Sequence, residues 1–313
     1  MAELGSGESL KPAASESGDS PRGVLLALIA YLLWGLLPFF MKAVAHIPAP
    51  EIIAHRVVWS LPIVGGYIVW LGRTADLKRA LTNPRMLAMA CLTAALITVN
   101  WGIYVWSIAA GRALEAALGY YINPLLSILL GAVLLKEKLS RAQMVAIALA
   151  VLAVAILTID AGGLPWVSIC LALSWAFYAF FRKTLPVGPN QGFFLEVMLL
   201  SGPAVAYILW LETTGQGHFG DTGPADVGLL LACGAVTAVP LLLYANGAKL
   251  LKLSTIGIMQ YIAPTMIFFI AVFAFGEPFG LVKLAAFALI WSALAVYTGS
   301  MYVSARQARR TAG

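Results

Sequence analysis

The sequence predicts an all-α polytopic membrane protein with ten transmembrane helices, arranged as two inverted five-helix repeats. The first observation is composition, because 61% of the 313 residues are hydrophobic and 11% are charged. Ordinary soluble domains are about 25% charged, and a soluble fold of this length could not bury so much apolar surface. The second observation is the length of the apolar runs, and the third is an internal repeat.

Apolar runs of about 18–25 residues can cross the hydrocarbon core of a bilayer as helices. Ten such runs follow one another, near residues 23–42, 50–71, 85–110, 114–135, 141–159, 165–182, 190–211, 227–248, 254–275 and 281–303. Residues 1–21 are rich in Ser, Gly, Ala and Glu, a composition that predicts a disordered tail. Residues 305–313 form a short basic tail.

The positions of lysine and arginine predict how the chain is oriented. With the N-terminus in the cytoplasm, 16 of the 20 Lys and Arg residues fall in inner segments, three fall outside, and Arg56 lies within a run. This bias follows the positive-inside rule and predicts that both termini are cytoplasmic. Because the cations lie between apolar runs, the net charge of +6 does not indicate a nucleic-acid partner.

Nothing in the sequence indicates a metal site or a cofactor. Cys91, Cys170 and Cys233 all fall inside apolar runs, and their spacing fits neither a disulfide framework nor a zinc site. No Walker motif for ATP binding is present. We therefore expect no cofactor, no metal and no direct use of ATP.

The internal repeat becomes visible when the chain is shifted by 140 residues. The motif YIxP occurs at 121–124 and at 261–264, and a glutamate follows each proline after 13 residues, as Glu137 and Glu277. An odd number of helices in each half inserts the second half upside down, an arrangement common in secondary transporters. The predicted repeats are residues 22–160 and 161–304.

Several stretches together resemble one family. They are HRVVWS (55–60), NWGIYVWSI (100–108), LEAALGYYINPLLSILLGAVLLKEKL (114–139), LALSWAFYAFFRK (171–183) and STIGIMQYIAPTMIFFIAVFAFGE (254–277). Over roughly residues 22–304 the chain resembles the RarD-type branch of the EamA transporters, in the drug/metabolite transporter superfamily. The resemblance implies a ten-helix carrier of the bacterial inner membrane, a permease or exporter linked to chloramphenicol resistance. It names no natural substrate.

Charged groups within membrane spans are costly and usually face a protein interior or a water path. Arg56 lies inside the second span, beside His55 and five residues after Glu51. We expect Arg56 to help hold an anionic group, such as a carboxylate, in an outer vestibule of the substrate path. The alternative is an ion pair with Glu51 or Glu115 that fastens helices together.

Glu196 occupies the position equivalent to Arg56 in the second repeat. It is a candidate for carrying a coupling proton or for pairing with a cationic group of the substrate. The alternative is an ion pair with Arg182 or Lys183. Glu137 and Glu277 end their spans near water, so we expect them to cap helix ends or to pair with lysine.

Polar and aromatic side chains at helical spacing predict the rest of the substrate path. The candidates are His55, Trp59, Asn100, Tyr104, Tyr120, Tyr121, Asn123, Tyr244, Gln260 and Tyr261, and Trp34, Trp59 and Trp101 are deep enough in their spans for an aromatic cage. Pro124, Pro240 and Pro264 are expected to bend helices beside a cavity, because proline removes a backbone donor and the freed carbonyl needs a partner. Helix–helix packing by small, weakly polar groups is the alternative.

The leading prediction is a secondary carrier for small organic metabolites or drugs that works by alternating access. An intramembrane enzyme acting on lipids is less favoured, because the sequence lacks the HExxH and GxSxG motifs and any paired carboxylate motif. A channel or an accessory subunit is the third possibility. The expected partners are a small-molecule substrate and the lipid bilayer, with the chain acting as a monomer or a homodimer.

Overall fold

The computed structural model describes residues 19–72, 75–134, 136, 138–184, 186–220 and 223–312. Most of the predicted N-terminal tail, up to residue 18, and Glu137 lie outside these ranges. Within them all regular secondary structure is helical, which confirms the predicted all-α class.

The helices match the predicted spans in number, order and approximate length. They are α1 (Pro21–Ala43), α2 (Ala49–Trp70), α4 (Pro84–Ala109), α5 (Ala113–Leu134), α6 (Arg141–Ala161), α7 (Trp166–Thr184), α8 (Pro189–Thr213), α9 (Pro224–Gly247), a ninth segment made of α10 (Leu253–Met259), α11 (Ile262–Phe269) and a π-helical turn (Ile270–Ala274), and α12 (Leu281–Ala312). Within the described ranges nine segments are long and apolar enough to cross a membrane, and Trp166–Arg182 is a shorter apolar helix.

Two helical regions differ from the expectation. α3 (Ala75–Thr82) lies between α2 and α4, where no helix was expected. Its amphipathic sequence, ADLKRALT, places Leu77 against an apolar cluster that contains Met86 and Leu195, while Lys78 is exposed. The second region is 305–312, predicted as a tail, which instead continues α12.

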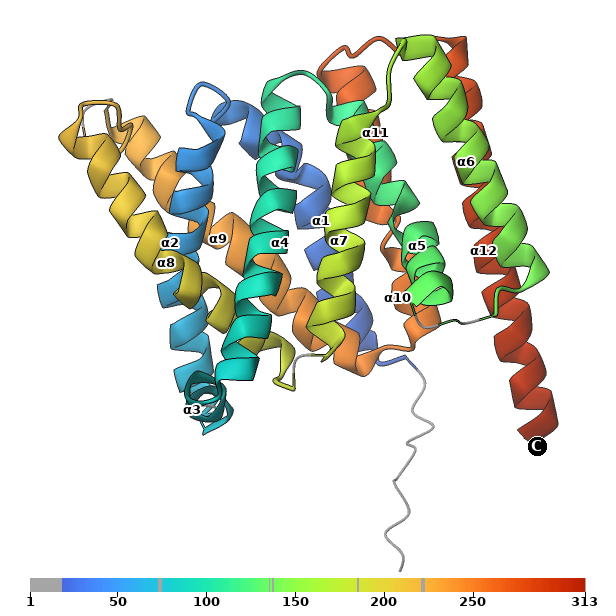
Figure 1. The fold of residues 1–313 in the computed structure, drawn as a ribbon, viewed down its shortest axis with the longest axis horizontal. Coiled ribbons are helices and arrows are strands. Elements are labelled where there is room, and N and C mark those ends of the chain that lie inside the picture. Colours follow the sequence, from blue (N-terminus) through green and yellow to red (C-terminus); the bar gives the residue numbers. More distant parts are fainter. Residues whose placement is uncertain are drawn as a thin grey trace, which may run out of the picture.

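The helix contacts are paired by the two-fold relation between the halves. α5 packs on α7 as α1 packs on α11, α4 packs on α7 as α1 packs on α9, and α2 packs on α9 as α4 packs on α8. The pairs α2–α8, α5–α11 and α6–α12 are their own counterparts. The fold is therefore two inverted five-helix repeats that share one core, with α1 beginning and α12 ending on the same side (Figure 1).

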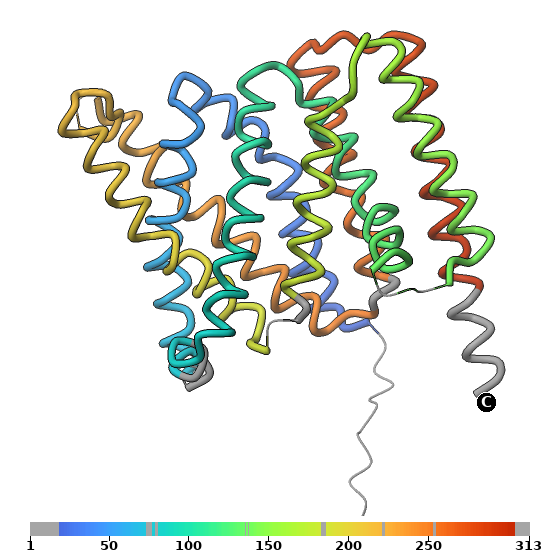
Figure 2. Tube along the Cα trace, viewed as in Figure 1, coloured from blue at the N-terminus to red at the C-terminus, as the bar shows by residue number. Residues whose placement is uncertain are grey.

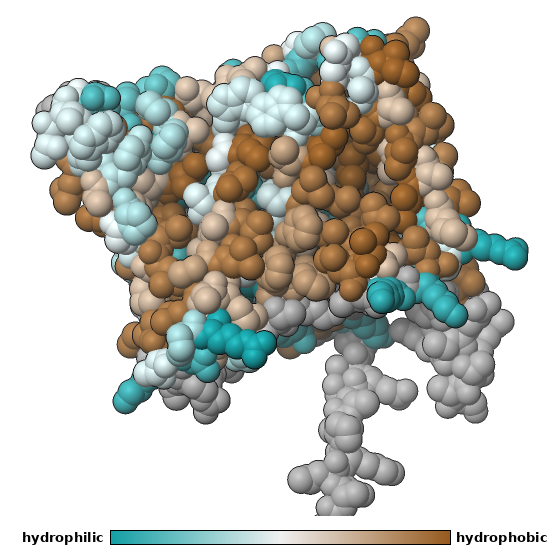
Figure 3. All heavy atoms as spheres, viewed as in Figure 1, coloured by the Kyte–Doolittle hydropathy of each residue, from teal (hydrophilic) through white to brown (hydrophobic). Residues whose placement is uncertain are grey.

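α6 and α12 pack along one another at one edge of the molecule, on the right in Figures 1 and 2. Figure 3 shows a broad apolar band across the middle of the face in view, with most polar side chains gathered toward its two ends. This distribution is what a bilayer requires, because lipid tails cover apolar surface while loops meet water. The chain is a multi-pass membrane protein.

Close packing between the halves depends on small residues. A Cβ added to Gly119 of α5 would lie 2.8 Å from the carbonyl oxygen of Ser168 on α7, and one added to Gly234 of α9 would overlap the backbone of Trp59 on α2. Small residues at such contacts let helix backbones approach closely, as is usual in membrane bundles. Substitution of Gly119 would push α5 away from α7, and substitution of Gly234 would push α9 away from α2. Each of these contacts joins one repeat to the other.

The ninth segment is broken where the sequence predicts a continuous helix over 254–275. α10 ends at Met259 and α11 begins at Ile262, so Gln260 and Tyr261 form a turn between them. Pro264 explains the position, because it has no N–H to donate to the carbonyl of Gln260 four residues earlier. α5 and α9 remain continuous across Pro124 and Pro240.

The start of α5 is capped by a carboxylate from the other repeat. Glu277, in the loop before α12, accepts hydrogen bonds from the backbone N–H groups of Ala113 at 2.5 Å and Leu114 at 2.9 Å. Burial raises the pKa of Glu277, and these two donors oppose the shift. An acceptor at a helix N-terminus satisfies donors that have no intrahelical partner. The expectation that Glu277 caps a helix end is therefore confirmed.

We predict that Glu277→Ala lowers the free energy of unfolding by about 1 kcal/mol, because a helix cap of this kind contributes roughly that much. The thermal midpoint of the detergent-solubilised protein should then fall by a few degrees, as about 2–4 °C per kcal/mol is usual for large domains. Glu277→Gln keeps one acceptor oxygen, so its thermal midpoint should fall less. Equal midpoints for wild type and the alanine variant would show that the cap does not stabilise the fold.

Candidate functional site

A central cavity of about 200 Å³ lies among eight of the ten membrane segments. None of the described residues of α6 or α12 lines it. Seven of the predicted substrate-path residues do: Arg56, Asn100, Tyr104, Tyr120, Asn123, Tyr244 and Gln260. The sequence patterns thus placed residues from five separate segments on a common space.

Six further aromatic rings line the cavity. They are Tyr31, Trp34, Trp101, Trp175, Tyr178 and Phe193. Trp34 and Trp101 are two of the tryptophans expected to form an aromatic cage. Trp34 and Trp175 align when the chain is shifted by 141 residues, so the repeat itself could have identified Trp175. Tyr31, Trp34 and Tyr244 pack against one another at ring-centroid distances of 5.4–5.7 Å, and Tyr31 meets the other two rings edge to face.

Arg56 is held in a fixed orientation inside this cavity. Its Nε donates a hydrogen bond of 2.9 Å to Thr237 Oγ1, and the Thr237 hydroxyl in turn donates to the carbonyl of Cys233 at 2.7 Å. The guanidinium carbon lies 4.6 Å from the ring centroid of Trp101, within the range of a cation–π interaction. Nη1 is buried and makes no hydrogen bond to the described part of the chain.

The ion pairs proposed as the alternative for Arg56 are not formed. Glu51 contacts His218, with its carboxylate 2.8 Å from Nδ1, and Glu115 contacts Arg112 at 2.6 Å. Among the described residues no acidic side chain lies within 4.0 Å of the Arg56 guanidinium. The positive charge in the cavity is therefore not neutralised by the described protein.

Glu196, by contrast, has a cationic partner. Its side chain is 1% exposed, Arg182 Nε lies 3.2 Å from Oε1, and the Tyr178 hydroxyl donates to Oε2 at 3.2 Å. A Cβ on Gly192 would overlap the Arg182 guanidinium, so a larger residue at this position would displace the arginine side chain. The ion pair with Arg182, the alternative stated for Glu196, is present, and Tyr178 links it to the cavity wall.

Asn100 contributes to packing as well as to the cavity. Its Nδ2 donates to the carbonyl of Leu171 and to Ser174 Oγ, each at 3.0 Å, which ties α4 to α7. Tyr104 and Asn123 differ, because the Tyr104 hydroxyl and Asn123 Oδ1 are buried without a hydrogen-bond partner in the described chain. The rings of Tyr104 and Tyr120 lie 5.8 Å apart.

His55 and Trp59 lie outside the cavity lining and form an aromatic cluster with Phe219. Trp59 Nε1 donates to His55 Nδ1 at 2.9 Å, and the Phe219 ring lies 5.1 Å from His55 and 5.7 Å from Trp59. Phe219 belongs to the segment between α8 and α9, which Glu51 holds through the backbone N–H of His218 at 2.7 Å. The cluster therefore packs α2 against the segment that joins the end of α8 to the start of α9.

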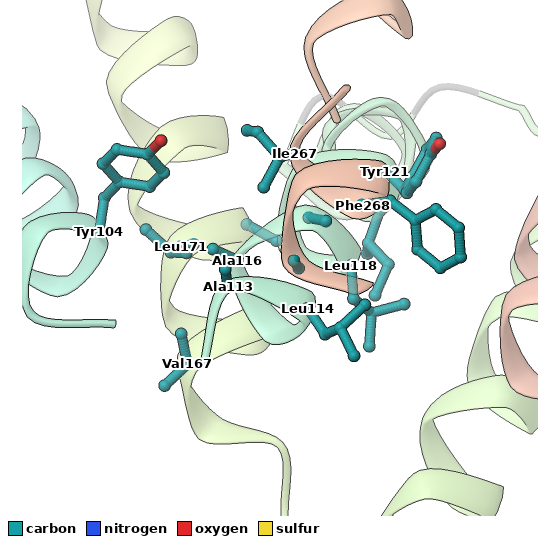
Figure 4. Packing of buried hydrophobic residues seen from close by; sticks show 14 of the residues in the cluster. Tyr104, Ala113, Leu114, Ala116, Leu118, Tyr121, Val167, Leu171, Ile267 and Phe268 are labelled. Carbon is teal, nitrogen blue, oxygen red and sulfur yellow. The ribbon is translucent and has the colours of Figure 1, made fainter. Parts of the chain in front are cut away.

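Tyr121 and Tyr261 also lie outside the central cavity. Their rings stack at 6.4 Å, and the Tyr121 hydroxyl is 2.7 Å from Thr265 Oγ1. Both line a separate apolar groove between α5, α11 and α12. In Figure 4 Tyr104 and Tyr121 lie on opposite sides of the packed cluster. Of the three prolines expected to bend helices beside a cavity, Pro264 lines the central cavity, whereas Pro124 and Pro240 are buried and do not line it.

Comparison with known proteins identifies the class. The model of the EamA-like transporter family matches the chain twice, over residues 21–159 and 163–299. The chain belongs to the EamA-like transporter family and is a membrane transporter of small molecules. A solved crystal structure whose description names no function has a TM-score of 0.57 and 21% identity, covering 88% of this chain and 96% of that one, a likeness that supports the fold alone.

The relatives place the chain with transporters of the RarD type. It is 42% identical over 287 residues to Protein RarD of Streptomyces exfoliatus, covering 92% of this chain and 91% of the relative. Protein RarD of Escherichia coli is 38% identical, with 90% and 95% covered. Chloramphenicol-sensitive protein RarD of Pseudomonas aeruginosa is 33% identical, with 93% and 98% covered.

We predict that Glu51→Gln loosens the segment that carries Phe219. Replacing the carboxylate weakens both contacts to His218, and hydrogen bonds to charged groups contribute about 1.5–3 kcal/mol. Amide hydrogen exchange over residues 214–220 should therefore accelerate at least about tenfold. Asp160→Asn, which removes an exposed carboxylate from α6, is the control with the same change of charge. Unchanged exchange in Glu51→Gln would contradict the role given to the Glu51–His218 contact.

Proposed function

We propose that this chain is a secondary transporter for small organic anions, metabolites or drugs, in the bacterial inner membrane. The observation that supports this most directly is the Arg56 guanidinium, which is 4% exposed and unpaired by any described carboxylate. A buried cation without a counterion is costly, and a carboxylate of the substrate would relieve that cost. The aromatic wall provides stacking surface for the remainder of the substrate.

The inverted repeats support transport by alternating access. Two structurally related halves with opposite orientation can exchange inward-open and outward-open arrangements around a shared site. The turn at Gln260–Tyr261 provides a place where the ninth segment can bend, because Pro264 already leaves the Gln260 carbonyl without its helical donor. Eight of the ten membrane segments of the chain surround the cavity, so one chain can enclose the proposed site, and a homodimer would contain two such cavities.

The orientation and direction belong to the same proposal. Most Lys and Arg residues fall on the side where α1 begins and α12 ends, which supports cytoplasmic termini under the positive-inside rule.

A relative named as a chloramphenicol-sensitive protein supports testing efflux of chloramphenicol alongside carboxylates. Chloramphenicol carries no carboxylate, so its transport would depend on the aromatic wall more than on Arg56.

We predict that Arg56→Lys lowers carboxylate counterflow at least about tenfold in proteoliposomes. Lysine keeps the charge but cannot bond Thr237 through Nε while directing two further donors at an oxyanion. Arg112→Lys is the matched control, because Arg112 also stacks on tryptophans, Trp106 and Trp166, but lies outside the central cavity. Full activity of Arg56→Lys would rule out a bidentate role for this guanidinium.

We keep Glu196 as the candidate coupling group, because Tyr178 connects it to the cavity. The expected result for Glu196→Gln is that a pH gradient no longer changes net uptake, while counterflow at equal pH continues. Uptake would be followed with and without the gradient in the same vesicles. A gradient effect of wild-type size in Glu196→Gln would show that the Glu196–Arg182 pair is structural and does not couple transport to protons.

A further inference from the structure

Three polar groups converge on the central cavity without a partner in the described chain. They are Nη1 of Arg56, the hydroxyl of Tyr104 and Oδ1 of Asn123, and each atom is buried. The three residues are 4%, 2% and 7% exposed, respectively. Buried polar groups are nearly always hydrogen-bonded in native proteins. Three unpartnered polar groups in one cavity therefore indicate a binding site for a polar ligand.

The three groups differ in what they can bond. The guanidinium only donates, the hydroxyl donates or accepts, and an amide oxygen only accepts. Arg56 and Tyr104 can therefore both hold a carboxylate. Asn123 Oδ1 cannot bond a carboxylate oxygen and needs an O–H or N–H group instead.

The repeat gives an independent argument that Asn123 is there for binding. At the 140-residue shift Asn123 corresponds to Ala263, which also lines the cavity and also precedes the proline of the YIxP motif. The fold therefore accepts alanine at this place on a helix. By contrast, Tyr104 corresponds to Tyr244, which lines the cavity from the second repeat. The Asn123 amide therefore has no counterpart in the second repeat.

We propose that the substrate is a small carboxylate that also carries a hydrogen-bond donor, and that Asn123 selects for the donor. The carboxylate lies against Arg56 and Tyr104, and the O–H or N–H group of the substrate donates to Asn123 Oδ1. This assignment rests on the proposed function, because it places the anion at Arg56. It adds a second recognition point on a different helix, α5.

Mandelate and phenylacetate test the proposal, because they differ only in an α-hydroxyl group. Binding to the purified full-length protein in detergent would be followed by tryptophan fluorescence, since Trp101 stacks on Arg56. We expect mandelate to bind at least about tenfold more tightly, because a site built to bond a hydroxyl rejects the analogue that lacks it. Asn123→Ala should abolish this preference, and it introduces the residue that the second repeat already carries.

Two further variants separate the possible outcomes. Ser292→Ala, on the exposed face of α12, should keep the preference for mandelate. Arg56→Gln should weaken both probes, and unchanged binding of both would overturn the proposed function together with this inference. Two results would overturn the role of Asn123 but not the anion site at Arg56. One is equal affinity of the wild type for the two probes, and the other is a preference for mandelate that persists in Asn123→Ala. Failure of the wild type to bind either probe at millimolar concentration would overturn the assigned substrate class, a small carboxylate that carries a hydrogen-bond donor.

Discussion

A bilayer offers the backbone no hydrogen bonds, and this constraint determines most of the structure. Each membrane segment must satisfy its own N–H and C=O groups, so helices cross the membrane and irregular backbone occurs only where protein surrounds it. The turn at Gln260–Tyr261 shows the rule in detail, because Pro264 leaves the Gln260 carbonyl without its usual donor and Gln260 lines the central cavity. The same rule explains why α5 needs the carboxylate of Glu277 at its first residues.

The second constraint is the burial of one cation, and magnitudes indicate how it is tolerated. A charged side chain at the centre of a membrane helix costs roughly 2.5–3.5 kcal/mol on insertion scales. A desolvated cation–π contact returns about 2 kcal/mol, and a charged hydrogen bond about 1.5–3 kcal/mol. Trp101 and Thr237 can thus hold Arg56 without a carboxylate. The free donor capacity that remains is what a substrate anion would use, whereas the equivalent Glu196 is already occupied by Arg182.

Much of this fold follows from the sequence, because apolar run length and the 140-residue repeat predict the ten segments and their inverted order. Helical spacing also identified Asn100, Tyr104, Tyr120 and Asn123 as members of one cavity wall. Spacing cannot predict how far each helix is rotated about its axis. It therefore places Tyr121 in the substrate path with Tyr120, whereas Tyr121 faces the separate apolar groove between α5, α11 and α12. Spacing also cannot predict partners distant along the chain, which is why Glu51 is considered only as an alternative partner for Arg56, whereas the structure pairs it with His218. α3 is too short and too polar to be noticed among membrane spans.

The length of α12 has a consequence for how the protein can be studied. Its 32 residues extend about 48 Å at the usual rise per residue, well beyond a hydrocarbon core of about 30 Å. The helix stands at the edge of the molecule beside α6, and none of its described residues lines the central cavity. A fluorescent protein or an affinity tag that follows α12 would therefore be held to one side of the transport path. Labels at this end can report on insertion and abundance without obstructing the substrate.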